Sequence, residues 1–436
     1  MLDFLTTFWI NLTGQPQTPL QIKDAMGVSR RIGEPWSVLI ETADLRAQQL
    51  LGQYLKKLSA QGLPTNEQGL WMQSGVALLA NNQGKTPLPA ASLTKVATSL
   101  AALETWGPQH QFDTLIATDG AVQNGVLQGN LIVQGSGDPM FVTEEAIALG
   151  VALNQIGIRQ VTGDLVITGN FMMNFEWDPL KSGTLLKQAL NAGTWSGDMA
   201  ETFTKLPPNA KLAIKPQVAI SGNVRYAQPV QANLLIQHQS LPLWNLVKRL
   251  NIYSNNVMAE VLSRLLGGPQ ATATKAAQAA GISPNEILLA NGSGLGVENR
   301  ISPHAVAAMF AAVKRYAEGQ GMTIADLFPI SGTDKGTIED REIPIYTVVK
   351  TGTLNDVSAL AGFLPTRDQG VVLFSVINRG ANLDGLRSSQ DVLLQQGQSL
   401  WGKPVARPME LTPTQGTTDV TTLGIMQRNR VPAAPK

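Results

Sequence analysis

The order of the hydrophobic patterns constrains the fold of this 436-residue chain more than any other feature. Apolar residues at three- and four-residue spacing predict amphipathic helices, and short runs rich in Val, Ile and Leu predict strands. The helical patterns span residues 43–61, 90–106, 243–266 and 303–318, and the strand-like runs span residues 69–80, 343–350, 358–364 and 371–378. Because the last three strands follow one another without a helix between them, they are expected to pair antiparallel. The chain is therefore predicted to form an α+β fold, in which helices cover an antiparallel sheet and a helical subdomain accompanies it.

The middle of the chain, residues 112–231, differs in character from the parts on either side. Short apolar runs such as Val161–Gly169 alternate there with Gly, Asn and Asp, which predicts a β-rich inserted domain. The flanking parts, residues 37–111 and 232–400, are then expected to form one discontinuous domain. The segment 401–436 is rich in Pro and Thr and lacks periodicity, so it is predicted to be disordered.

Residues 1–36 contain an apolar run, Leu2–Leu12, that is too short for a membrane span of about 20 residues. An export signal carries basic residues before its apolar part, whereas here Asp3 comes first and the first basic residue is Lys23. The segment is interpreted as a poor match to an export signal or anchor. A frayed amphipathic terminus is the alternative.

The composition excludes several classes of chemistry. With 33 Lys and Arg against 32 Asp and Glu, the net charge of +1 provides no general attraction to nucleic acid. The chain has no cysteine, which excludes disulfides, thiolate nucleophiles and iron–sulfur clusters. Its three histidines, His110, His238 and His304, lack the spacing of metal ligands, and the last two are interpreted as structural. No metal and no cofactor is therefore expected.

A Ser-x-x-Lys motif opens the second helical pattern. Ser92 and Lys95 are three residues apart, so both side chains project from one face of the helix. A lysine can activate a serine as its base when burial lowers the lysine pKa from about 10.4. Free N–H groups at the start of a helix would stabilise an anion there. The spacing also occurs about once by chance in a chain of this composition, so a solvated helix face is the alternative.

A Ser-x-Asn motif follows much later in the chain. The hydroxyl of Ser254 could relay a proton, and the amide of Asn256 can both donate and accept hydrogen bonds. Ser254 also opens a helix-like segment, so its alternative role is that of an N-cap.

The most specific motif is Lys350-Thr351-Gly352-Thr353, which is predicted to end a strand. Chance gives roughly a tenth of an occurrence of Lys-Thr-Gly in such a chain. A cation and a hydroxyl at a strand edge suit recognition of a carboxylate. Gly352 would let a ligand backbone approach closely, and the N–H that follows could donate to an oxyanion. An exposed turn is the alternative.

Together and in this order, the three motifs resemble those of the penicillin-recognising serine enzymes, the DD-peptidases and serine β-lactamases. More narrowly, residues 69–400 resemble the class C low-molecular-mass penicillin-binding proteins, the D-Ala-D-Ala carboxypeptidase/endopeptidase family. That family inserts domain material between the first two motifs, as this chain does. Further stretches that agree with the family are residues 89–95, 135–139, 254–260, 292–295, 299–303 and 350–354. Asn291 departs from the pattern, since the family usually has Asp there.

The resemblance implies a serine DD-peptidase that cleaves D-Ala-D-Ala termini of peptidoglycan stem peptides and, as an endopeptidase, their cross-links. It implies β-lactam antibiotics as covalent inhibitors and a location in the periplasm or cell envelope, and it leaves the oligomeric state open. The roles that it implies are Ser92 as nucleophile, Lys95 as general base, Ser254 as proton relay, Asn256 as the group that orients Lys95, Lys350 and Thr351 as carboxylate ligands beside Gly352, and the N–H groups of Ser92 and Thr353 as the oxyanion hole.

Two alternatives stay open. A class A serine β-lactamase needs a glutamate in the pattern Glu-x-x-Leu-Asn; the stretch Glu286–Ala290 lacks the final Asn and is interpreted as a strand leading to Gly292. A catalytically weak peptidoglycan-binding module of the same fold is the second alternative, and the intact motif residues argue against it. An α/β-hydrolase is not supported, since Gly-x-Ser-x-Gly does not occur.

Overall fold

The computed structural model describes residues 40–41, 44–210, 212, 214–229, 231–416 and 422–432. The predicted export signal or anchor in residues 1–36 lies outside the described residues. The described helices all belong to the unit formed by residues 41–436. They are α3 (Leu45–Ser59), α4 (Thr94–Trp106), α5 (Thr143–Gln155), α6 (Pro179–Ala189), α7 (Gly197–Thr204), α8 (Leu243–Tyr253), α9 (Asn256–Leu265), α10 (Pro269–Ala280), α11 (Pro303–Gly319) and α12 (Leu383–Leu400). Within the described part of the chain, no helix is long and apolar enough to cross a membrane.

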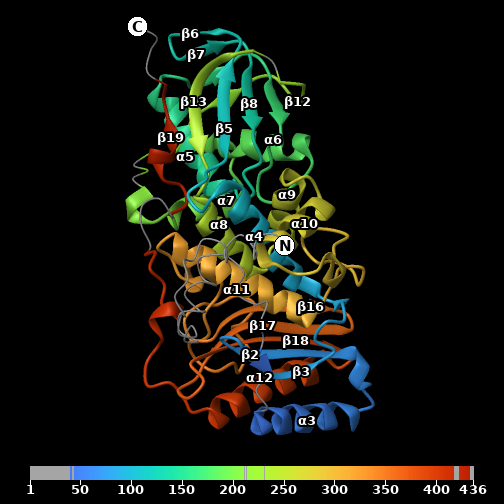
Figure 1. Cartoon of the computed structure of the whole chain (residues 1–436). Helices are drawn as coiled ribbons and strands as arrows, with labels where there is room; N and C mark the ends of the chain where they lie inside the picture. The colour runs from blue at the N-terminus through green and yellow to red at the C-terminus, as the bar shows by residue number, and fades with distance from the viewer. Residues whose placement is uncertain are drawn as a thin grey trace, which may run out of the picture. The chain divides into compact units, whose positions relative to one another are not determined.

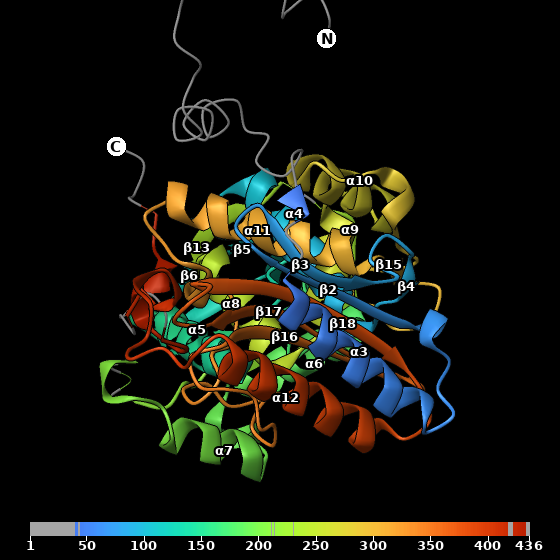
Figure 2. The same ribbon diagram turned by 60° about the horizontal axis from the view of Figure 1, so that its bottom comes forward.

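The main sheet confirms the predicted helix-covered antiparallel architecture. Five of its strands run in the order β3, β2, β18, β17, β16, and each neighbouring pair among them is antiparallel. Helix α11 packs on one face, while α3 and α12 pack on the other (Figures 1 and 2). The bounds are β2 Gln68–Ser74, β3 Ala77–Asn82, β16 Val348–Leu354, β17 Val357–Pro365 and β18 Val371–Arg379.

Helix α3 shows how the sequence pattern produces this layer. The side chain of Asp44 accepts hydrogen bonds from the N–H groups of Arg46 and Ala47, which satisfies two of the free donors at the helix start. Leu50 and Leu58 lie on its buried face and belong to the core under the sheet. Burying such a leucine stabilises the fold by about 1.5–3 kcal/mol.

Three of the predicted helices and strands have different bounds in the structure. The run 69–80 forms two strands, because Gly75 turns the chain with a φ of +53°. The pattern 243–266 forms two helices, because Ser254 adopts the left-handed conformation between them. The strand predicted at 343–350 begins only at Val348, after a turn in which Tyr346 has a φ of +68°, so Lys-Thr-Gly lies inside the strand rather than at its end.

The middle region is organised around a second sheet, with strands in the order β12, β10, β8, β5, β13, β19. The prediction of a β-rich segment missed helices α5, α6 and α7. Most of the side chains of α5 are buried around its whole circumference, so its sequence lacks the amphipathic period that marks a surface helix. Strand β13 continues this sheet beyond residue 231, where the insertion was predicted to end.

The strands of the second sheet are β5 Asp113–Thr118, β8 Leu131–Gly135, β10 Leu165–Gly169, β12 Val224–Tyr226, β13 Asn233–Gln239 and β19 Asn429–Arg430. The chain also contains two smaller sheets. One contains β11 Ala219–Ile220, β9 Gln160–Val161, β7 Val126–Gln128 and β6 Ala121–Gln123, and the other contains β14 Ile287–Leu288, β15 Arg300–Ile301 and β4 Leu88–Pro89.

The C-terminal segment corrects the prediction that residues 401–436 are disordered. In its described parts, 401–416 and 422–432, Trp401, Leu411 and Ile425 are buried and β19 pairs with β13 (Figure 1). These apolar residues are far apart and each docks on a surface that the rest of the chain provides. A segment held in this way needs no periodicity of its own, which is why its pattern resembled that of a disordered tail.

Candidate active site

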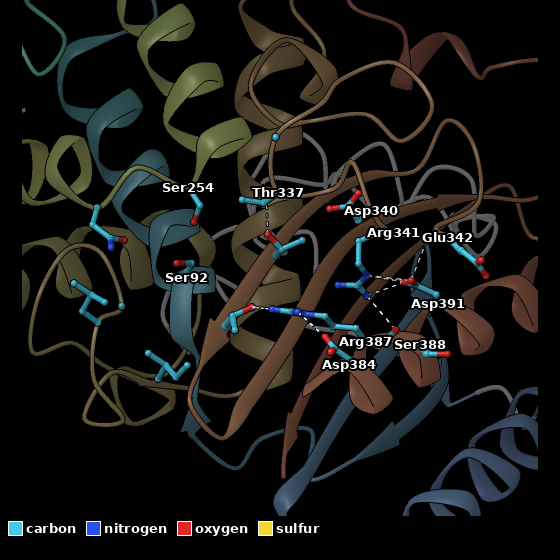
Figure 3. A pocket seen from close by; sticks show the side chains of 17 residues that line it. Ser92, Ser254, Thr337, Asp340, Arg341, Glu342, Asp384, Arg387, Ser388 and Asp391 are labelled. Atoms are coloured by element: carbon cyan, nitrogen blue, oxygen red, sulfur yellow. Dashed lines mark hydrogen bonds and ion pairs between the residues drawn. The ribbon is translucent and has the colours of Figure 1, made fainter. Parts of the chain in front are cut away.

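Ser92 lies in a tight 3-10 turn, Ala91–Leu93, that leads directly into α4. Ala91 has a φ of +47°, a conformation that residues with a Cβ rarely adopt and that is found preferentially at functional sites. The turn leaves the side chain of Ser92 at the edge of a cavity (Figure 3).

Lys95 is fully buried one turn further along α4. Its Nζ lies 2.8 Å from Ser92 Oγ, 2.7 Å from Asn256 Oδ1 and 2.7 Å from the carbonyl oxygen of Ser293. Burial lowers the pKa of Lys95 to about 7, against the nearby negative charge of Glu260, which raises it. A substantial share of Lys95 is therefore neutral at neutral pH and able to take a proton from Ser92.

The break between α8 and α9 places both polar residues of the second motif. Ser254 ends α8 with φ and ψ of 51° and 40°, and Asn255 caps α9 by accepting a hydrogen bond of 3.0 Å from Met258 N. The N-cap alternative for Ser254 is therefore wrong, since its neighbour has that role. Ser254 and Asn256 are left to line the cavity of Ser92.

Lys350 completes the cluster from strand β16. Its fully buried Nζ donates to Ser254 Oγ at 3.0 Å and to the carbonyl oxygen of Thr351 at 2.8 Å. Burial lowers the pKa of Lys350 well below its ordinary value, and the charge of Lys95 lowers it further. Thr351 Oγ1 lies 2.8 Å from Thr337 Oγ1. The structure thus brings the three distant motifs together.

Gly352, which is expected to let a ligand approach the strand, packs against the turn that carries Ser92. A Cβ at this position would lie 3.1 Å from each of Ala90 O, Ala91 Cβ and Ser92 N, which are atoms of the nucleophile turn. The missing side chain lets strand β16 pack directly against that turn. The glycine therefore sets the separation between Ser92 and the strand, in addition to any approach of a ligand.

One cavity of about 820 Å³ is lined by residues of all three motifs and extends well beyond them (Figure 3). Its lining is mainly polar, and its charged residues come from the segment before β16 and from α12 (Figure 3). The lining residues are Ser92, Ser254, Asn256, Gly294, Leu295, Gly336, Thr337, Asp340, Arg341, Glu342, Thr351, Thr353, Leu354, Asp384, Arg387, Ser388 and Asp391. Within the described residues, no group of three or more His, Asp or Glu side chains is placed to hold a metal ion.

Glu260 supports the site and was not singled out from the sequence. Its carboxylate accepts hydrogen bonds from the N–H groups of Gly292 and Ser293, at 3.1 Å and 2.9 Å. It thereby fixes the loop whose Ser293 carbonyl contacts Lys95. Its position four residues after Asn256 on a helix was the available signal, because residues at that spacing share a helix face.

Asn291 holds the same loop where the family usually has Asp. Its Oδ1 accepts from the N–H of Gly294 at 2.8 Å, and its Nδ2 donates to the carbonyl oxygen of Leu295 at 2.5 Å. The second bond needs a donor, which an ionised aspartate lacks.

Glu286, the residue considered for a β-lactamase, is engaged in structural contacts. Its Oε2 accepts from Ser302 Oγ at 2.6 Å and lies 2.8 Å from His304 Nδ1. The expected structural role of His304 agrees with this contact. His238 is likewise buried, with its Nδ1 2.9 Å from Asn429 Oδ1.

Comparison with solved structures shows the class of fold. The penicillin G-acylated Bd3459 predatory endopeptidase of Bdellovibrio bacteriovorus, in complex with its immunity protein, has a TM-score of 0.69 and 20% identity over 84% of this chain and 98% of that one. Penicillin-binding protein 4 of Haemophilus influenzae has a TM-score of 0.61 and 21% identity over 80% of this chain and 99% of that one. The fold is that of the penicillin-recognising serine enzymes.

Sequence comparison shows the family. The profile of the D-Ala-D-Ala carboxypeptidase 3 (S13) family matches residues 52–180 and 182–396, and the chain belongs to this family. The D-alanyl-D-alanine carboxypeptidase DacB of Haemophilus influenzae is 25% identical over 399 residues, 69% of this chain and 82% of that protein. A carboxypeptidase of Mycobacterium tuberculosis is 26% identical over 349 residues, 70% of this chain and 74% of that protein.

Proposed function

We propose that this chain is a serine DD-peptidase that cleaves D-Ala-D-Ala termini of peptidoglycan stem peptides, and their cross-links, through an acyl-enzyme on Ser92. One observation carries the proposal: the buried amine of Lys95 lies 2.8 Å from Ser92 Oγ, that of Lys350 lies 3.0 Å from Ser254 Oγ, and both serines line one cavity. Membership of the S13 family and the activities named for its relatives support it.

Acylation begins with the neutral amine of Lys95. The amine takes the proton of the Ser92 hydroxyl. The Ser92 Oγ then attacks the carbonyl carbon of the penultimate D-Ala. Asn256 and the Ser293 carbonyl hold the amine in place throughout this step. The N–H groups of Ser92 and Thr353 stabilise the oxyanion, and one such donor lowers the barrier by about 3–4 kcal/mol.

As the C–N bond breaks, Ser254 passes its proton to the leaving nitrogen and regains one from Lys95, which had taken it from Ser92. Because its hydroxyl oxygen accepts a hydrogen bond from Lys350, its own proton is free to be donated. The terminal carboxylate of the substrate binds at Lys350 and Thr351, and its negative charge raises the pKa of Lys350 again. The bound substrate thus favours the charged form of the lysine that holds it. Water then releases the acyl group from Ser92.

β-Lactam antibiotics are proposed as covalent inhibitors that acylate the same Ser92. The proposed substrate also implies that the protein acts in the cell envelope, in the periplasm where one exists. This location follows from the position of peptidoglycan.

Labelling with a fluorescent penicillin tests the proposal. Wild type and Ser221→Ala, which alters an exposed serine between β11 and β12, are expected to bind the label covalently, and Ser92→Ala is expected to lose it. Wild type should also release D-Ala from D-Ala-D-Ala peptides. Equal labelling of Ser92→Ala would contradict the proposal. Label without peptide cleavage would point to a binding module, and fast release of hydrolysed penicillin would point to a β-lactamase.

A further inference from the structure

Arg387 is a cation in the cavity of Ser92 to which neither the motifs nor the comparisons assign a role. It lies in the first turns of α12, and its side chain points from that helix toward the part of the cavity that holds Ser92 (Figure 3). Its side chain is 36% exposed, so its charge faces the cavity and solvent.

The contacts of Arg387 leave its charge available to a ligand. Its Nη1 lies 3.0 Å from Asp384 Oδ1, but the Asp384 side chain is 93% exposed, so solvent screens this pair strongly. By contrast, Arg341 in the same cavity is buried and bonded by both carboxylate oxygens of Asp391, which gives it a structural role.

The second contact of Arg387 points to the reacting part of the cavity. Its Nη2 donates to Thr353 Oγ1 at 3.3 Å. Thr351 and Thr353 are two residues apart on β16, so their side chains share one face of the strand, and both line the cavity. Because Thr353 Oγ1 accepts from Arg387, its own proton is free to bind an anion. A carboxylate on this face would meet two hydroxyl groups and a guanidinium.

We propose that Arg387 binds the substrate carboxylate together with Thr353, so that the enzyme selects leaving groups that carry a carboxylate on the carbon next to the scissile nitrogen. The inference rests on the proposed DD-peptidase function and adds Arg387 as the residue that selects for the carboxylate. A terminal D-Ala has such a carboxylate, and so does a cross-linked residue that is attached through its α-amino group.

The difference in charge between Lys350 and Arg387 supports this role. Lys350 is fully buried and its pKa is lowered, so its charge depends on what is bound beside it. A guanidinium keeps its charge at all physiological pH values and its planar donors match a carboxylate. Arg387 therefore offers a permanent positive charge to the incoming substrate.

A matched pair of substrates tests the proposal. Values of kcat/KM are measured for an acylated peptide that ends in D-Ala-D-Ala with a free carboxylate and for the same peptide with a C-terminal amide. Arg387→Ala is expected to lower kcat/KM for the free acid about 10- to 100-fold and to change that for the amide less than about twofold. Arg387→Lys should recover part of the loss. Arg367→Ala, which removes an exposed arginine from the turn between β17 and β18, should leave both values unchanged.

A β-lactam pair repeats the comparison if the amide is cleaved too slowly to measure. Competition against a fluorescent penicillin gives acylation rates for benzylpenicillin and for its methyl ester, which lacks the carboxylate charge. Only the rate with benzylpenicillin should fall in Arg387→Ala. Thermal unfolding of each variant shows that the fold is retained.

Two outcomes would overturn the inference and leave the proposed function standing. An equal loss of kcat/KM on the acid and the amide would mean that Arg387 only positions Thr353. Unchanged kcat/KM on both substrates would mean that Arg387 has no role in substrate binding. If wild type neither cleaves the peptides nor becomes labelled at Ser92, the proposed function fails, and the inference fails with it.

Discussion

At the scale of single residues, the sequence identifies the reactive groups but not their environment. The three motifs indicated Ser92, Lys95, Ser254 and Lys350, and the structure brings all four together. What motif spacing cannot give is burial, and burial is what lowers the pKa of Lys95 to about 7. Motif spacing also does not reveal Glu260, because its effect depends on a contact with a loop that lies more than thirty residues further along the chain.

The pKa of Lys95 predicts how acylation depends on pH. Only the neutral amine can take the proton of Ser92, so the acylation rate should rise with pH, with an apparent pKa near 7. Glu260→Gln removes the negative charge that raises the pKa of Lys95, so the rise should move to lower pH. Labelling rates with a fluorescent penicillin from about pH 5 to 9 measure this. Glu298→Gln, an exposed carboxylate on the same loop, is the control. A rise that stays in place, or moves to higher pH, in Glu260→Gln would contradict the role given to Lys95.

At the scale of elements, helices and strands were predicted where local periodicity decides the structure. The helices α3 and α11 and the strands β17 and β18 lie within a few residues of the predicted ranges. The predictions failed where single residues in unusual conformations interrupt a pattern. Ser254 breaks one helical pattern in two, and the turn at Tyr346 delays the start of β16. Positive φ at residues with a Cβ depends on tertiary contacts, which sequence propensities do not contain.

The packing of β16 on the nucleophile turn predicts a strong effect of Gly352→Ala. The new Cβ would lie 3.1 Å from atoms of Ala90, Ala91 and Ser92, so strand and turn must separate by a few tenths of an ångström. Overpacking of this kind costs about 1–3 kcal/mol of stability, and the displaced Ser92 N–H should lower the acylation rate at least about tenfold. Thermal unfolding and penicillin labelling measure both effects.

Gly52→Ala on α3 is the control for that variant. A Cβ at this exposed helical position meets nothing within 4 Å, and alanine favours the helix by about 0.5–1 kcal/mol over glycine. Its acylation rate should match that of wild type. Equal acylation rates in Gly352→Ala and Gly52→Ala would show that the contact between strand and turn does not control the nucleophile.

At the scale of the whole chain, residues far apart in sequence determine what local patterns miss. The C-terminal segment adds β19 to the sheet of the middle region, and its Arg428 forms a buried ion pair with Glu145 of α5. Glu145 also accepts from the N–H of Gly424, so two residues of this segment bond one buried carboxylate. Pairings over such separations leave no trace in local composition, and the segment was therefore predicted to be disordered.

The buried pair predicts how the C-terminal segment contributes to stability. Arg428→Ala leaves the Glu145 carboxylate buried beside a neutral side chain, which should cost about 3–5 kcal/mol of unfolding free energy. Arg430→Ala removes an exposed arginine from β19, two residues further along the chain, and should change stability by less than about 0.5 kcal/mol. The double variant Glu145→Leu with Arg428→Met removes both charges and should recover much of the loss, because an apolar pair of similar size needs no compensating charge. Thermal and denaturant unfolding measure the three variants, and penicillin labelling of Ser92 reports separately on the active site. If Arg428→Ala is no more destabilising than Arg430→Ala, the buried pair does not hold the segment, and the docking of Trp401, Leu411 and Ile425 must account for its order.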